Sequence, residues 1–171
     1  MIKVNTPAGR DRNGHKIKMI VVHAMSEYIM HDGKELYAPH FLNKIGLSCH
    51  YMVLPHGGIM ECSDPENRIA WHAKGFNENS VGIELLVPGL HDYESFLDAI
   101  KKPKWSGMHQ RQSLVKLTYN LFSKFGNDLQ VVRHSDIDPE NKKDPGEGFQ
   151  WDWFMMKTKK VPVKAFIGID L

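Results

Sequence analysis

The chain has little cysteine, no long apolar run and almost no net charge, and each shortage excludes a class of protein. Its two cysteines, Cys49 and Cys62, are not in CxxC spacing. That pattern offers neither a cysteine-type zinc knuckle nor a disulfide framework, so we interpret both as core thiols. No stretch approaches the roughly 20 apolar residues of a membrane-spanning helix, and we expect no membrane span.

The charge distribution and the N-terminus exclude further classes. The net charge is +2, and no basic block or arginine-rich helix is present. This argues against nucleic acid as a partner, although a mildly basic chain fits an anionic polymer. The opening "MIKVNTPAGRDRNGHK" has no apolar segment of a secretory signal, so we expect no signal peptide and cytoplasmic synthesis.

What the sequence does contain is an ordinary globular composition, with 42% hydrophobic and 25% charged residues among 171. We expect one domain over residues 1–171, acting as a monomer. Stretches with the composition of strands or of a hairpin are 16–25, 49–63, 80–87 and 129–134. Stretches with helical signals are 37–46 and 107–126.

This order of elements predicts an α/β or α+β domain with one central mixed β-sheet flanked by helices. The tail, residues 157–171, has no clear assignment, and we interpret it as a terminal strand or a disordered segment.

Glu84 is the unusual residue of the third strand, because it stands inside the apolar run "VGIELLV". A buried carboxylate is costly unless it is paired, hydrogen-bonded or near a metal. His23 and His134 each lie at or near the end of a predicted strand, where loops build sites. Asp144 follows His134 within "HSDIDPENKKDPG".

Two imidazoles and a carboxylate that leave one position open form a catalytic zinc arrangement. Spacing alone leaves zinc undecided. There is no HExxH pair, and most of the ten histidines are expected to be surface or core residues.

Four segments in order carry a resemblance to a known family: "IVVHAMS", "SCHYMVLPHGGIM", "AWHAKGFNENSVGIEL" and "RHSDIDPENKKDPG". Over residues 20–146 the chain resembles the zinc-dependent N-acetylmuramoyl-L-alanine amidases. That group includes phage endolysin amidases, muropeptide-recycling amidases and peptidoglycan recognition proteins. The resemblance implies Zn²⁺ in an open groove at strand ends, with His23, His134 and Asp144 as its ligands. It also implies hydrolysis of the amide between N-acetylmuramic acid and L-alanine in bacterial peptidoglycan.

Within that family the chain is similar to the branch with a catalytic glutamate. Cys49 stands where other members carry a tyrosine, and Asp144 stands where the phage-lysozyme type has a cysteine. The resemblance implies that Glu84 is the general base and then the general acid. It implies that Lys142 stabilises the developing oxyanion. The neighbouring Lys143 keeps open the reading of Lys142 as a solvated loop lysine.

His72 and Asn79 match a substrate-lining part of the family motif, and no atomic role follows from the sequence. His50 is interpreted as a structural residue. Trp71, Trp151 and Trp153 are candidates for stacking on sugar rings, but core packing is the expectation for each.

Three biological contexts remain open, namely a phage endolysin, a cell-wall remodelling enzyme and a cytoplasmic recycling enzyme. The segment "LVPGLHDYESFLDAIKKPKWSGMHQRQ" resembles endolysin-like members and favours an endolysin or wall-lytic enzyme, released to the cell wall through a holin. A cytoplasmic recycling enzyme acting on soluble anhydro-muropeptides is the alternative. A non-catalytic peptidoglycan-binding module is disfavoured, because such modules typically lose a ligand.

Overall fold

The computed structural model describes residues 2–160, and its centre is a seven-stranded mixed β-sheet in the order β1-β6-β5-β8-β3-β4, with β9 beside β3. The strands of this sheet are β1 (Ile2–Lys3), β3 (Met19–His31), β4 (Lys34–Tyr37), β5 (Tyr51–Val53), β6 (Ile59–Glu61), β8 (Ser80–His91) and β9 (Gln130–Arg133). A separate two-stranded sheet pairs β2 (Arg10–Asp11) with β7 (Arg68–Ile69). The helices are α1 (Ala38–Lys44), η1 (Asn77–Asn79), α2 (Tyr93–Lys101), α3 (Met108–Phe125), α4 (His134–Ile137) and α5 (Trp151–Lys160).

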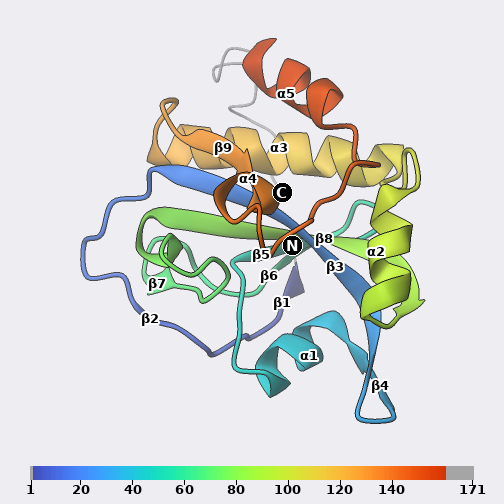
Figure 1. Cartoon of the computed structure of the whole chain (residues 1–171). Coiled ribbons are helices and arrows are strands. Elements are labelled where there is room, and N and C mark those ends of the chain that lie inside the picture. The colour runs from blue at the N-terminus through green and yellow to red at the C-terminus, as the bar shows by residue number, and fades with distance from the viewer. Residues whose placement is uncertain (1, 161–171) are drawn as a thin grey trace.

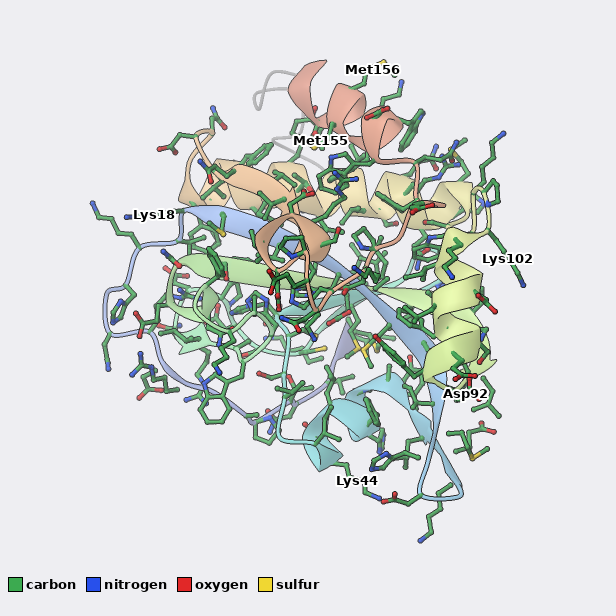
Figure 2. The ribbon with its side chains drawn as sticks, viewed as in Figure 1. Lys18, Lys44, Asp92, Lys102, Met155 and Met156 are labelled. Carbon is green, nitrogen blue, oxygen red and sulfur yellow. The ribbon has the colours of Figure 1, made fainter. Side chains whose placement is uncertain are left out.

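Helices cover both faces of the sheet, as the sequence predicted (Figure 1). In the view of Figure 1, α3 lies above the strands with α5 above it, and α1 lies below them. Figure 2 shows Met155 on the side of α5 towards α3 and Met156 on the outer side. This agrees with their burial, because Met155 packs against the main core and Met156 is exposed.

Side-chain alternation along β8 explains how an acid can stand in an apolar strand. Val81, Ile83 and Leu85 belong to the core under α3. Successive strand residues point to opposite faces, so Glu84 and Leu86 face the side of α1, where Leu86 joins the second core. A strand covered on both faces is apolar throughout, and Glu84 is the exception on its α1 side.

The two longest strands, β3 and β8, are parallel neighbours and extend beyond the strands that flank them. β9 ends at Arg133, which is paired with Val22 of β3. β5 ends at Val53, which is paired with Leu85 of β8. The prediction that His23 lies near the end of its strand was therefore wrong, because β3 continues to His31. β3 and β8 therefore have no strand beside them on those sides beyond the points where β9 and β5 end.

The helices at 37–46 and 107–126, the hairpin at 49–63 and the three other strand regions are all present, but α2 and α5 were not predicted. The interpretation of the tail as a strand or disordered segment was wrong for Lys157–Lys160, which belong to α5. Residues 161–171 lie outside the described part of the chain. Within residues 2–160, no helix combines the length and the apolar character that crossing a membrane requires.

Candidate active site

Three residues predicted as metal ligands lie together on the α1 side of the sheet. His23 comes from β3, His134 follows the last residue of β9, and Asp144 comes from the loop after α4. The Nδ1 atoms of the two histidines are 2.9 Å apart. Asp144 Oδ2 lies 3.0 Å from His134 Nδ1 and 3.3 Å from His23 Nδ1. The three donor atoms therefore form a compact triangle, with both histidines buried.

The chemistry of this triangle fits zinc. Zinc bonds of about 2.0–2.2 Å to nitrogen and oxygen would place tetrahedral donors about 3.3 Å apart, close to the observed separations. Among residues 2–160, His23, His134 and Asp144 are the only candidate metal cluster. Three protein donors, which leave a position for water or substrate, are typical of catalytic rather than structural zinc.

Glu84 lies directly beside the triangle. It is the register partner of His23 on the neighbouring parallel strand, and adjacent strands are only about 4.8 Å apart. Its side chain lines the cavity that contains the three donors. Its Oε2 atom is buried and has no hydrogen-bond partner among the described residues. Burial and the negative charge of Asp144 raise the pKa of Glu84 well above its ordinary value.

The electrostatic surroundings of His23 and Asp144 favour metal binding. Burial lowers the pKa of His23, although Asp144 opposes that effect, and a neutral imidazole is the form that binds metal. Burial tends to raise the pKa of Asp144, but its contacts with the imidazoles of His134 and His23 outweigh burial and lower that pKa far below its ordinary value. The triangle therefore presents a carboxylate, and His23 presents a neutral nitrogen donor.

Lys142 and Lys143 both line the cavity, and their side chains differ in what they contact. The Lys143 ammonium donates a hydrogen bond to the Pro139 carbonyl at 3.0 Å, which turns it back onto its own loop. The charge of Lys142, in contrast, acts on two residues of the site, since it lowers the pKa of Glu84 and of His23. This difference favours Lys142 as the lysine that acts on the site.

The structure separates the two residues predicted to bind substrate. His72 lines the cavity and touches His23, with 2.9 Å between His72 Nδ1 and His23 Nε2. Asn79 belongs to η1, which directly precedes β8, and unlike Glu84 it does not line the cavity. The amide that supports this region is Asn77, whose Oδ1 accepts hydrogen bonds from the backbone N–H groups of His72 and Ala73.

His50 and the two cysteines lie beneath the site. His50 is fully buried, and its Nδ1 accepts a hydrogen bond from the Gly82 N–H at 3.0 Å. Cys49 and Cys62 are free thiols in the second core. Burial raises the pKa of Cys49, so this side chain is held as a neutral thiol.

The cavity has a volume of about 300 Å³ and continues from the triangle between α1 and α2. Sequence reasoning identified Trp71 as a candidate for sugar contact but missed the other aromatic and apolar residues of its wall, among them Phe41, Tyr93, Phe96 and Leu97. Trp71 is 44% exposed and Tyr93 is 67% exposed. The expectation of core packing was therefore wrong for Trp71, whereas Trp151 and Trp153 do pack against the main core.

The fold and site together define a class: a mixed sheet with a three-donor candidate metal centre and a buried carboxylate at the base of an open cavity. The family model described as N-acetylmuramoyl-L-alanine amidase matches residues 13–147. The chain belongs to this family, and the family predicted from the sequence is confirmed.

Two curated relatives and one solved structure show the range of similarity. The 1,6-anhydro-N-acetylmuramyl-L-alanine amidase AmpD of Haemophilus influenzae is 28% identical over 131 residues, which cover 71% of this chain and 65% of that protein. The endolysin of Enterobacteria phage T3 is 32% identical over 91 residues, which cover 53% of this chain and 55% of that protein. The match thus spans less than two thirds of each relative.

The fold is similar to that of the N-acetylmuramoyl-L-alanine amidase LysC from Clostridium intestinale. The TM-score is 0.68 with 23% identity, over 92% of this chain and 96% of that one. This likeness confirms the predicted architecture, a mixed sheet flanked by helices.

Proposed function

We propose that the chain is a zinc-dependent amidase that hydrolyses the bond between N-acetylmuramic acid and L-alanine of bacterial peptidoglycan. The metal would be held by His23, His134 and Asp144. The observation that carries the proposal is the pairing of His23 with Glu84. It brings a buried carboxylate, whose Oε2 has no hydrogen-bond partner among residues 2–160, beside three converging metal donors. Family membership supplies the bond type.

In this reaction Glu84 would transfer the proton, and His23, His134 and Asp144 would hold the metal. Zinc, when bound, would polarise a carbonyl and lower the pKa of a water to about 7. Glu84 takes the proton of the attacking water and delivers it to the amine of L-alanine as the C–N bond breaks. Its raised pKa strengthens it as a proton acceptor, and its burial keeps bulk water from taking the proton first.

Lys142 contributes positive charge to the same reaction. The carbonyl oxygen of the substrate gains negative charge as water attacks, and a nearby cation stabilises that charge. The effect of Lys142 on the pKa of Glu84 supports this role, because it means that the two charges interact. Lys142 also lines the cavity from the loop that carries Asp144, so ligand and cation share one support.

For the form of the substrate, we propose wall peptidoglycan. Trp71 and Tyr93 line the cavity and are both exposed, and exposed aromatic faces suit the sugar rings of an extended glycan strand. The soluble anhydro-muropeptide remains the second candidate, because the Haemophilus relative is named for that substrate and matches 71% of this chain.

The test uses mass spectrometry of products from intact sacculi and from a soluble anhydro-muropeptide, each with and without zinc. The proposal predicts peptides with a free L-alanine amine and glycan strands without new reducing ends, formed faster from sacculi. His134→Ala is the control and should release neither product. New reducing sugars would indicate a glycosidase, and cuts within the peptide would indicate a peptidase. Zinc-loaded protein that binds sacculi without cleaving them would indicate a binding module.

A further inference from the structure

A chain of hydrogen bonds leads away from the metal triangle on the far side of His23. His23 Nε2 lies 2.9 Å from His72 Nδ1. His72 Nε2 lies 3.1 Å from the Ser80 hydroxyl. That hydroxyl donates to the Phe76 carbonyl at 2.6 Å. These hydrogen bonds thus connect one candidate ligand, His23, to a backbone carbonyl through the side chains of His72 and Ser80.

The carbonyl at the end of this chain sets the direction of every proton in it. A carbonyl oxygen can only accept, so the Ser80 hydrogen is committed to Phe76 and its lone pairs face His72. His72 then donates from Nε2, which leaves a lone pair on Nδ1 towards His23. His23 must donate from Nε2 in turn, which leaves the lone pair of its Nδ1 at the corner of the triangle for a metal. A neutral histidine that binds a metal through Nδ1 must carry its proton on Nε2.

The packing around His72 holds its ring in this orientation. A Cβ atom added at Gly82 would lie 2.5 Å from His72 Cγ, so the ring rests on the bare backbone of β8. The backbone at His72 is fixed by the Asn77 side chain, which accepts at 3.0 Å. The rings of His23 and His72 meet edge to face, with centroids 5.1 Å apart. Both nitrogens of His72 are therefore engaged within the protein.

We propose that His72, supported by Ser80, is a positioning residue that fixes the tautomer and orientation of His23 for metal binding. This rests on the proposed zinc centre and adds a role for His72 other than contact with substrate. Outer partners of ligating histidines typically contribute about 10–100-fold to metal affinity. The contribution of Ser80 is smaller, because it acts on the metal ligand only through His72.

The experiment measures zinc affinity by chelator competition in His72→Phe, which keeps the ring volume over Gly82 and removes both hydrogen bonds. Ser80→Ala keeps the backbone and removes only the hydroxyl. Ser113→Ala is the matched control, because the Ser113 hydroxyl also donates to a backbone carbonyl, that of Gly57 at 2.7 Å, away from the site. We expect zinc binding to weaken about 10–100-fold in His72→Phe, to weaken less in Ser80→Ala, and to be unchanged in the control.

Long-range proton–nitrogen NMR spectra of the zinc-loaded protein test the same idea without any variant. Both His23 and His72 should carry their proton on Nε2. A proton on Nδ1 of His72, or unchanged zinc affinity in both variants, would overturn the proposal. If His72→Phe does not fold, Ser80→Ala decides the outcome. Wild-type protein that binds zinc but cleaves no amide would refute the proposed function alone, whereas wild-type protein that binds no zinc would refute both.

Discussion

At the scale of single residues, Glu84 is held at an energetic cost. A buried polar atom without a hydrogen bond costs about 1–3 kcal/mol, and more if it is charged. Its Oε2 lacks a partner among residues 2–160, although leucine or valine would complete the strand. Strained or unsatisfied groups of this kind concentrate at functional sites. The position of Glu84 beside His23 therefore accounts for an acid in an otherwise apolar strand.

Glu84→Gln keeps the shape of the side chain and removes its basicity. Losing a positioned proton acceptor should lower kcat by about 10²–10⁴-fold, while zinc content stays near that of wild type. Glu61→Gln, on β6, is the control for the same substitution on a strand outside the cavity. More than about a tenth of wild-type activity would refute the general-base role. Loss of zinc would show instead that Glu84 is a ligand.

His50 should make the metal-free protein sensitive to acid. Burial lowers its pKa to about 3 in the folded state, against about 6.5 in an unfolded chain. Between these values the unfolded state binds the extra proton, so stability falls as pH decreases from 6.5 towards 3. The slope is at most about 1.4 kcal/mol per pH unit for this one group.

Denaturant unfolding at pH 7, 6 and 5 measures this effect. In His50→Gln the slope of unfolding free energy between pH 6 and 5 should decrease by about 1 kcal/mol per pH unit relative to wild type. His109→Gln, on the exposed side of α3, controls for the substitution itself. An unchanged slope in His50→Gln would show that the buried imidazole does not titrate in this way.

At the scale of elements, α3 does more than cover the core. Gln110 is fully buried, and its amide donates to the carbonyls of Val53 and Leu86, each at 2.9 Å. These carbonyls lie where β5 ends beside β8. The helix therefore satisfies backbone groups that the shortened strand leaves open, two residues beyond Glu84.

Gln110→Leu removes both of those hydrogen bonds while keeping similar volume. Each buried carbonyl left without a partner costs about 1–3 kcal/mol, so unfolding free energy should decrease by about 2–5 kcal/mol. The control is Gln112→Leu, an exposed position on the same helix. Equal stability of the two variants in urea unfolding would show that the Gln110 bridge is not important.

The sequence predicted the elements with strong periodicity or turn signals and missed those that depend on neighbours. The core helix and the hairpin carry such signals locally. α2 was missed although Phe96, Leu97 and Ile100 give it an apolar side, and although the reciprocal hydrogen bonds of Asp92 and Ser95 form a capping box, which is a local signal. α5 was missed because its aromatic residues were considered only as sugar or core contacts.

For the site, the motifs identified which residues converge but not how they are supported. The triangle of His23, His134 and Asp144 follows the predicted grouping. The contact between His72 and His23 spans 49 positions and depends on the bare backbone of Gly82. Such contacts depend on the register of β8 against β3, which the amino-acid sequence alone does not reveal.

At the scale of the whole molecule, the candidate metal centre joins distant parts of the chain. His23 and His134 are 111 positions apart, and Asp144 also accepts a hydrogen bond from the Ala24 N–H at 3.4 Å. A ligand that binds only the folded state stabilises it, by about 2.7 kcal/mol at 100 times its Kd. Zinc binding and folding should therefore be coupled through β3, β9 and the Asp144 loop.

The most direct test titrates zinc into metal-free protein while counting the L-alanine amines released from peptidoglycan. The account predicts no release without metal, an increase with each addition, and a plateau at one zinc per chain. Release that is complete without metal would contradict the zinc centre. Absence of L-alanine amines at every zinc concentration would contradict the amidase reaction.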